Sequence, residues 1–267
     1  MDCRILNGSS GLSFGGMMKI SIVTIAFNAE ATIAEAARSV TEQERDGFEL
    51  EYIVVDGAST DGTLAALAPY REGIDTVISE PDRGLYDAMN KGVAAATGDF
   101  VGILNADDAY AHSRVLAAVV AKLIETGRDA LYGDLNYVAA DGSNKIVRKW
   151  RSGNYQRRAF LNGWMPPHPA FFLRRSVYNQ HGLFSLELKS AADYELMLRM
   201  LFKHETSTVY LPEVLVHMRT GGVSNASWKN RWRANREDLM AWRMNDLRPR
   251  PWTMLMKPLR KVVQWLR

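Results

Sequence analysis

The residues most able to do chemistry follow an apolar run at positions 100–104. Asn105, Asp107 and Asp108 come after this run, whose composition is typical of a buried strand. Ligands bind at the carboxyl ends of strands in open α/β sheets, and paired carboxylates there suit a hard divalent cation that carries a phosphate. A solvated turn, or a helix N-cap ahead of a helix beginning near Ser113, explains the same residues. These positions alone leave both interpretations open.

Three earlier predicted strands also end in polar residues. These are residues 19–27 with Asn28, 51–55 with Asp56, and 76–79 with Asp82 and Arg83; helices are predicted between the strands at 29–41, 64–70 and 86–96. Because consecutive parallel strands end at one edge of a sheet, four polar ends predict a cleft for a nucleotide. No G-x-G-x-x-G motif follows the first strand and no G-x-x-x-x-G-K-[ST] motif occurs. Phosphates would then need a cation held by Asp107 and Asp108.

The second half of the chain predicts a mixed sheet. A helix is predicted over 115–126, and strands over 130–138, 145–150, 170–173 and 210–216. The Asp141-Gly142 turn favours a hairpin between the first two of these strands. In the first half of the chain, predicted strands alternate with predicted helices. The chain as a whole is therefore predicted to form a doubly wound, mostly parallel α/β sheet with right-handed crossovers.

Other candidate residues lie in this half. His168 stands between prolines and is expected to pack in a loop, with the cleft as the alternative. Asp193 precedes a helix predicted from residue 195 onward, where an N-cap would stabilise the helix by about 1 kcal/mol. His217 and Arg219 follow the last strand and could meet phosphates.

Composition excludes several classes of protein. The chain has 267 residues, 47% of them hydrophobic, and a net charge of +3, which excludes a disordered protein. The single cysteine, Cys3, allows no disulfide framework and fits a reducing compartment. Residues 1–17 lack a signal-peptide pattern and are expected to be a disordered or non-native extension, with Met17 or Met18 as the start. No run approaches the roughly 18 apolar residues of a membrane span.

Residues 228–267 form a basic, tryptophan-rich tail. The tail holds eleven Lys and Arg residues against three acids, and five of the seven tryptophans. Leu255, Leu259, Val262 and Leu266 share one predicted helical face, which Pro258 would kink. Such a segment suits an anionic membrane surface, and equally an arm that packs on the core or on a second subunit. Nucleic-acid binding is disfavoured because it would leave the cleft unexplained.

The ordered motifs resemble those of the GT-A glycosyltransferases of family 2. The motifs are residues 21–28, 54–63, 87–92 and 104–108, and the resemblance extends over 19–224. The sequence of residues 83–92 is similar to that of the bacterial branch of the family, whose members build O-antigen, capsule and exopolysaccharide. The resemblance implies a GT-A domain over 18–227, with a Rossmann-like mixed sheet flanked by helices, followed by the helical extension. It also implies inverting, metal-dependent transfer from a nucleotide-diphosphate sugar.

The resemblance assigns roles to individual residues. Asp107 and Asp108 become a DxD-type site, with Asn105 at a position often taken by Asp; Asp108 would bind Mn²⁺ or Mg²⁺, and Asp107 the sugar or ribose. Gly57 departs from the pattern, since many members have Asp there, so base recognition would shift to Asp56, Asp82 or Arg83. The remaining residues expected around the nucleotide sugar are Thr24, Ala26, Phe27, Asn28, Lys91 and Ala106, with His217 as a further metal ligand.

Asp193 matches the catalytic base of the family. The base is a carboxylate heading a helix after the mid-domain hairpin, and Ala192-Asp193-Tyr194-Glu195 fits this description. The acceptor hydroxyl attacks the anomeric carbon opposite the diphosphate, so a group on that side must take its proton. An ordinary carboxylate can serve, because the hydroxyl becomes more acidic as it bonds to carbon.

Together these observations predict a cytoplasmic enzyme, peripheral on the cytoplasmic face of the inner membrane. It would move a sugar, most simply from a UDP-sugar, to a hydroxyl of a lipid-linked oligosaccharide in bacterial surface polysaccharide synthesis. A polyprenyl phosphate or a protein acceptor is the alternative, and a non-catalytic membrane-associated assembly module is the alternative from another class. A nucleotidyltransferase is disfavoured without a glycine-rich basic loop. The sugar, the linkage and a possible homodimer stay open.

Overall fold

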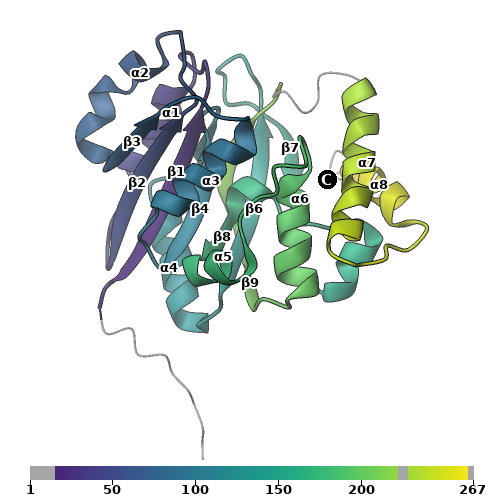
Figure 1. Ribbon diagram of the computed structural model, residues 1–267. Coiled ribbons are helices and arrows are strands. Elements are labelled where there is room, and N and C mark those ends of the chain that lie inside the picture. The colour runs from purple at the N-terminus through teal and green to yellow at the C-terminus, as the bar shows by residue number, and fades with distance from the viewer. Residues whose placement is uncertain (1–15, 222–227, 264–267) are drawn as a thin grey trace, which may run out of the picture.

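The computed structural model describes residues 16–221 and 228–263 (Figure 1). Most of the predicted extension over residues 1–17 lies outside the described residues. The strands are β1 (Met18–Ala26), β2 (Phe48–Asp56), β3 (Thr76–Ser79), β4 (Phe100–Asn105), β5 (Asp108–Tyr110), β6 (Ala130–Val138), β7 (Ile146–Trp150), β8 (Phe171–Arg174) and β9 (Thr208–Arg219).

These strands form one mixed sheet in the order β3-β2-β1-β4-β8-β6-β9-β5, with β7 paired to β6. The first four strands in this order run parallel, as predicted from the alternating first half of the chain. β8 is antiparallel to β4 and to β6, and β6 runs parallel to β9. The mixed, mostly parallel sheet is therefore the predicted architecture.

Helices cover both faces of the sheet. They are α1 (Ile33–Thr41), α2 (Thr63–Ala66), α3 (Leu85–Ala95), α4 (Val115–Thr126), α5 (Arg175–His181), α6 (Ala192–Met197), α7 (Trp228–Met244) and α8 (Thr253–Val263). Shorter helical segments are η1 (Ala68–Gly73), η2 (Arg157–Asn162), η3 (His168–Ala170) and the π-helical η4 (Leu198–Lys203). In Figure 1, α3 and α6 lie on the face turned toward the viewer, and α7 lies beside α6.

Two elements differ from the predictions in ways that matter for the cleft. α1 begins four residues later than predicted, because Asn28 takes a left-handed backbone (φ 48°) and the next residues form a turn. Asp108 belongs to a short strand, β5, that pairs with β9, so it caps no helix. Both differences arise from contacts with segments distant in the sequence.

The hydrophobic core lies on both faces of the sheet. β1 is apolar on both sides: Ile20 and Ile22 face the cluster under α1 and α4, whereas Val23 and Ile25 face the cluster under α3 and α6. This double burial is what parallel strands require and explains their continuous apolar runs. The buried strands hold the polar residues at their ends in fixed positions.

The described part of the tail packs on α6. The Trp242 side chain is fully buried, and its Nε1–H donates to the Tyr194 hydroxyl at 2.9 Å. Asn245 Nδ2 donates to Glu195 Oε1 at 3.0 Å, which ties α7 to the same helix. α7 therefore packs on the core, one of the alternatives open from the sequence. Among the described residues, no helix is long and apolar enough to cross a membrane.

Candidate active site

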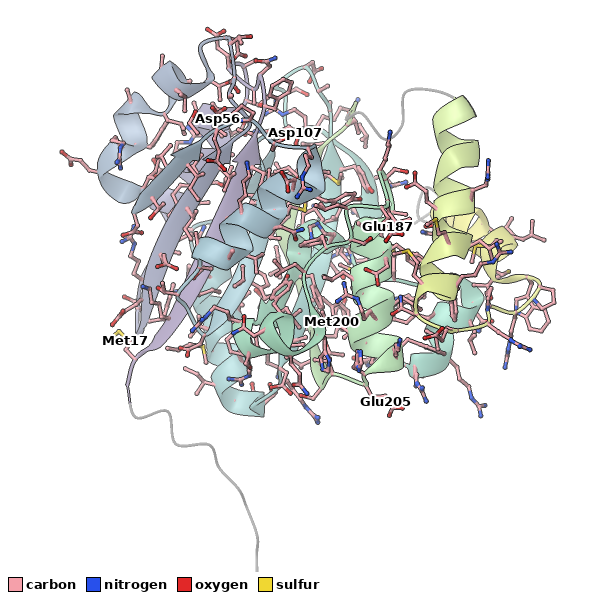
Figure 2. The ribbon with its side chains drawn as sticks, in the orientation of Figure 1. Met17, Asp56, Asp107, Glu187, Met200 and Glu205 are labelled. Atoms are coloured by element: carbon pink, nitrogen blue, oxygen red, sulfur yellow. The ribbon has the colours of Figure 1, made fainter. Side chains whose placement is uncertain are left out.

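The polar strand ends come together at one edge of the sheet. Ala26 at the end of β1 pairs with Asp56 at the end of β2, and Ile25 pairs with Asn105 at the end of β4. The backbone continues these contacts beyond the strands, since the Ala106 N–H donates to the Ile25 carbonyl at 3.1 Å. Figure 2 shows Asp56 and Asp107 at this edge and Met17 at the opposite end of the sheet.

Asp56 and Asn28 shape the loop that follows β2. The buried Asp56 carboxylate accepts hydrogen bonds from the Ser79 hydroxyl (2.7 Å) and the Ser59 N–H (3.1 Å). Asn28 donates its N–H to the Ser59 hydroxyl (2.8 Å) and accepts the Thr60 N–H at Oδ1 (3.0 Å). These two predicted nucleotide-binding residues therefore hold the loop rigidly against the end of β1.

The neighbours of Asn28 differ in exposure. Phe27 is 64% exposed and projects beside the loop, and Ala26 is buried directly before it. Thr24 is fully buried and accepts a hydrogen bond from the Tyr52 hydroxyl at 3.1 Å. Thr24 thus lies beneath the edge of the sheet, and the expectation that it lines the cleft does not hold in this structure. Its hydroxyl packs within the core because residues on β1 are buried on both faces.

Asp82 occupies the space that Gly57 leaves open. A Cβ atom at Gly57 would lie 2.4 Å from Asp82 Oδ2 and 3.3 Å from Phe27 Cδ2. Asp82 Oδ1 accepts the Gly84 N–H at 2.8 Å, so the carboxylate is held in place. A side chain at position 57 would displace it. The departure from the family pattern at Gly57 is therefore matched by a carboxylate that reaches the same place from the loop after β3.

Contacts with α3 stabilise this loop: Arg83, in the loop, pairs with Asp87 of α3, and Lys91 of α3 reaches back to the loop. The Arg83 side chain is largely exposed and pairs with Asp87 at 2.8 Å. Lys91 Nζ donates to the Pro81 carbonyl at 2.7 Å and pairs with Glu80 at 2.8 Å. Both residues were predicted to contact the nucleotide sugar, and here they pair with protein groups that fix the loop carrying Asp82.

Asp108 is buried and Asp107 is partly exposed. Asp108 is 1% exposed; its Oδ2 accepts the Asn105 side-chain amide at 2.9 Å and its Oδ1 accepts the Arg219 N–H at 3.3 Å. Burial, and then the charge of Asp107, raise the pKa of Asp108 to about 8. Burial also raises the pKa of Asp107, against the opposing charge of Arg219. Two neighbouring carboxylates whose ionised forms are disfavoured form a site that a cation would stabilise.

The oxygen atoms at this site fit a hard cation. Asn105 Oδ1 is buried and has no hydrogen-bond partner within the described part of the chain. Residues 16–221 and 228–263 contain no group of three or more His, Cys, Asp or Glu side chains that could hold a metal ion by themselves. Mg²⁺ in phosphate-transferring sites is commonly held by one or two carboxylates together with substrate phosphates. Asp107, Asp108 and Asn105 suit a cation of that kind.

His217 does not join these carboxylates. In the pairing of β5 with β9, Asp108 lies opposite Met218, and His217 lies opposite Ala109. Adjacent residues on a strand point to opposite faces, so the His217 side chain points away from that of Asp108. Burial lowers the pKa of His217, and the nearby charge of Glu35 opposes this. The register of β5 and β9 therefore places His217 on the opposite face from Asp108, and the metal contact from His217 stays a prediction.

Arg219 reaches the site through its backbone. Its N–H contacts Asp108, while its guanidinium pairs with Glu35 of α1. The backbone contact holds the buried carboxylate in position, and the charged side chain is anchored to α1. Arg219 therefore supports the carboxylates through its backbone, and its charge also opposes the rise in the pKa of Asp107 that burial causes.

Asp193 lies in the first turn of α6, where it caps nothing. Ala191 is the N-cap residue, and no side chain caps this helix. The Tyr86 hydroxyl donates to Asp193 Oδ1 at 3.2 Å. His168 is buried with its ring edge on Phe184 (5.5 Å), and the charge of Asp193 opposes the lowering of the His168 pKa by burial. His168 is thus a packing residue that also faces Asp193.

Tyr137 links the two groups of carboxylates. Burial raises its pKa, and the charges of Asp108 and of Asp193 both add to this effect. The Arg148 guanidinium lies over the Tyr137 ring at 3.6 Å. Neither residue was singled out from the sequence, although the predicted hairpin brings Arg148 opposite Tyr137. Tyr137 therefore lies within reach of the charges of both Asp108 and Asp193.

Comparison with known proteins indicates the same family as the sequence motifs. The model of the family "Glycosyl transferase family 2" matches residues 21–182. An uncharacterized glycosyltransferase of Mycobacterium tuberculosis is 33% identical over 210 residues, covering 77% of each chain. The succinoglycan biosynthesis protein ExoO of Rhizobium meliloti is 27% identical, covering 77% of this chain and 62% of ExoO.

Solved structures share the fold. Residues 1–349 of TarS from S. aureus, in complex with UDP, match with a TM-score of 0.64 and 22% identity, covering 86% of this chain and 67% of that one. The mannosyltransferase PcManGT of Pyrobaculum calidifontis, in complex with GDP-Man and Mn²⁺, matches with a TM-score of 0.62 and 20% identity, covering 91% and 69%. The predicted GT-A fold is confirmed. By its motifs, its fold and the extent of the family match, the chain belongs to glycosyl transferase family 2, and it is a glycosyltransferase.

Proposed function

We propose that the enzyme transfers a sugar from a nucleotide-diphosphate sugar, in the first instance a UDP-sugar, with inversion at the anomeric carbon. The observation that carries this proposal is that β1, β2 and β4 end at one edge of the sheet, beside Asp107, Asp108 and Asn105 Oδ1, which has no hydrogen-bond partner among the described residues. Tyr137 pairs across β9 in register with Asp108, and the charge of Asp193 also reaches it. A donor held by the first carboxylate group would present its anomeric carbon toward the second. The complexes of TarS with UDP and of PcManGT with GDP-Man and Mn²⁺ support a donor of this class.

In this mechanism Asp193 takes the proton of the acceptor hydroxyl. The hydroxyl oxygen forms a bond to the anomeric carbon while the bond from that carbon to the diphosphate oxygen breaks, and the nucleoside diphosphate leaves with the bonding electrons. Attack and departure on opposite sides invert the configuration. Mn²⁺ or Mg²⁺, when bound, would neutralise the leaving diphosphate as a Lewis acid.

Asp107 and Asp108 would hold this cation, with Asn105 Oδ1 as a further oxygen. Asp107 is the better candidate for direct contact because it is partly exposed, whereas both Asp108 oxygens already accept hydrogen bonds. This reverses the roles that the family resemblance implied. Asp108 would then orient the Asn105 side chain through their hydrogen bond and, when ionised, attract the cation from its buried position.

We further propose that Asp82 reads the nucleobase in place of a carboxylate at position 57. The uracil ring offers an N–H donor to a carboxylate, and a site built to accept that bond discriminates against bases lacking it. The fixed position of Asp82 beside Gly57 and Phe27 supports this assignment. Asp56 is then left to position the loop.

A donor panel tests the function and the base preference together. With Mn²⁺ and no acceptor, we expect slow release of nucleoside diphosphate from at least one UDP-sugar, faster than from GDP-Man. Asp82→Ala should reduce the preference for uracil about tenfold, and Glu72→Ala, at an exposed position on η1, should not change it. Absence of binding and turnover with every nucleotide sugar would overturn the donor proposal and favour a non-catalytic assembly module.

The acceptor that we propose is a lipid-linked oligosaccharide at the cytoplasmic face of the inner membrane. Support comes from ExoO, which is named for succinoglycan biosynthesis, and from the surface of α8. Trp252, Leu255 and Leu259 are 46%, 68% and 56% exposed, next to basic residues. Apolar and basic side chains together favour binding to anionic lipid surfaces. A polyprenyl phosphate or a protein acceptor would use the same donor site.

Vesicle binding tests this surface. Replacing Leu255 and Leu259 by Glu should weaken binding to phosphatidylglycerol vesicles about 10- to 100-fold, because the variant no longer buries two leucine side chains in the membrane surface. Ile124→Glu, at an isolated exposed position on α4, should bind as the parent does. Unchanged flotation of the double variant would instead assign α8 to a protein contact, including a homodimer.

A further inference from the structure

We propose that Tyr86 is the positioning residue of the catalytic base. Its hydroxyl would hold the Asp193 carboxylate in the orientation that receives the proton of the acceptor. This inference rests on the proposed function, in which Asp193 is that base. The contact that carries it is the hydrogen bond from the Tyr86 hydroxyl to Asp193 Oδ1, 3.2 Å long and formed between α3 and α6.

The Tyr86 hydroxyl lies at the start of α6. The backbone of Asp193 and of Ala192 lies near this hydroxyl and opposes the rise in its pKa, and the N-cap residue Ala191 has no polar side chain. The hydroxyl that donates to the carboxylate therefore also lies against the first turn of α6. Burial, and then the charge of Asp193, raise the pKa of Tyr86, so the hydroxyl keeps the proton that it donates.

The ring of Tyr86 is itself immobilised. It stacks on Phe184 with a centroid distance of 5.8 Å and an interplanar angle of 17°. Asn90, one turn later on α3, forms two 2.9 Å hydrogen bonds with the backbone of Phe184, one to its carbonyl and one from its N–H. Residues four apart on a helix share a face, so Tyr86 and Asn90 act on the same segment. The hydroxyl is consequently fixed relative to α6.

This arrangement assigns different tasks to the two carboxylate oxygens. Oδ1 is engaged by Tyr86, which leaves Oδ2 for the acceptor hydroxyl. The other titratable groups that sense the charge of Asp193 are His168 of η3 and Tyr137 of β6. Neither forms a hydrogen bond with Asp193, so among the described residues Tyr86 is the side chain that holds the orientation of the base.

Tyr86→Phe tests the proposal. We expect kcat for donor turnover to fall about tenfold with an unchanged KM for the nucleotide sugar, which is the effect of one hydrogen bond lost at the base. Tyr178→Phe is the matched control, because that buried ring also contacts Phe184 (6.4 Å) without reaching Asp193.

A double-variant cycle separates this proposal from the proposed function. Adding Tyr86→Phe to Asp193→Asn should cause no further loss, because Tyr86 acts through Asp193. Full activity of Asp193→Asn would refute the base itself; an inactive Asp193→Asn combined with a fully active Tyr86→Phe would refute only the positioning role.

A measurement without substrate gives an independent outcome. The ¹³C carboxyl resonance of Asp193, identified by its absence in Asp193→Asn, should shift in Tyr86→Phe and stay in place in Tyr178→Phe. An unshifted resonance in Tyr86→Phe would overturn the proposal even if activity were lost.

Discussion

Asp193→Asn is expected to lower kcat by about 10²- to 10⁴-fold, the range attributed to a positioned general base. The amide is nearly isosteric, and its oxygen can still accept from Tyr86, so the fold of α6 should persist. Affinity for UDP measured by calorimetry should be unchanged, because Asp193 lies on α6 and not in the loops after β2, β3 and β4 that we assign to the nucleotide. The loss should therefore appear in kcat and not in binding.

Glu187→Gln provides the matched control. Glu187 belongs to the same acidic stretch of the sequence but is exposed before α6 (Figure 2). Removal of its charge tests whether the general acidity of the region matters. Transfer that stays at the parental rate in Asp193→Asn, or that falls equally in Glu187→Gln, would exclude a specific base at position 193.

Glu195, the third acid of that stretch, has a structural role. It is 3% exposed, pairs with Arg199 at 2.8 Å and accepts a hydrogen bond from Asn245 of α7. Both Asp193 and Glu195 lie in the first turn of α6. Only the contact with α7, fifty residues away, identifies Glu195 as part of the packing between the tail and the core.

Much of the fold follows from local sequence patterns. The apolar runs of β1, β2 and β4 and their polar ends predicted the edge at which Ala26, Asp56 and Asn105 meet. Helix α4 and strand β6 have the predicted bounds. Such elements are buried along a continuous segment, and a buried segment can be recognised in the sequence as an uninterrupted apolar run.

The remaining features depend on partners that are distant in the sequence. β5 exists because β9 extends past the predicted strand to pair with Asp108. Asp82 fills the space at Gly57 from another loop, and Tyr86 meets Asp193 across 107 positions. Neither periodicity nor composition encodes such contacts. The resemblance to the family located the carboxylates, but only their burial distinguishes Asp107 from Asp108.

The distinction between these two carboxylates leads to opposite expectations for their variants. Asp107→Asn should lose Mn²⁺-dependent binding of UDP and lower transfer by about 10³-fold, because we assign to Asp107 the direct contact with the cation. Its effect on folding should be small, since the side chain is partly exposed. Asp46→Asn, in the exposed loop before β2, is the control for charge removal.

Asp108→Asn should instead change how stability depends on pH. In the cation-free protein the pKa of Asp108 is about 8, whereas an unfolded aspartate titrates near roughly 4. Between these values the folded state binds a proton that the unfolded state does not, so the free energy of unfolding falls as pH rises through this window. Asp108→Asn cannot ionise; it should match the parent below about pH 4 and exceed it in stability above about pH 8.

Thermal unfolding with and without Mn²⁺ and UDP tests both expectations. A cation that favours ionised Asp108 should release a proton on binding, so the ligands should stabilise the parent protein more as pH rises toward 8. Asp108→Asn should lose this pH dependence, and Asp107→Asn should lose the stabilisation itself. If Asp107→Asn bound Mn²⁺ and UDP as the parent does while Asp108→Asn did not, the buried carboxylate would be the ligand, and the roles implied by the family would be restored.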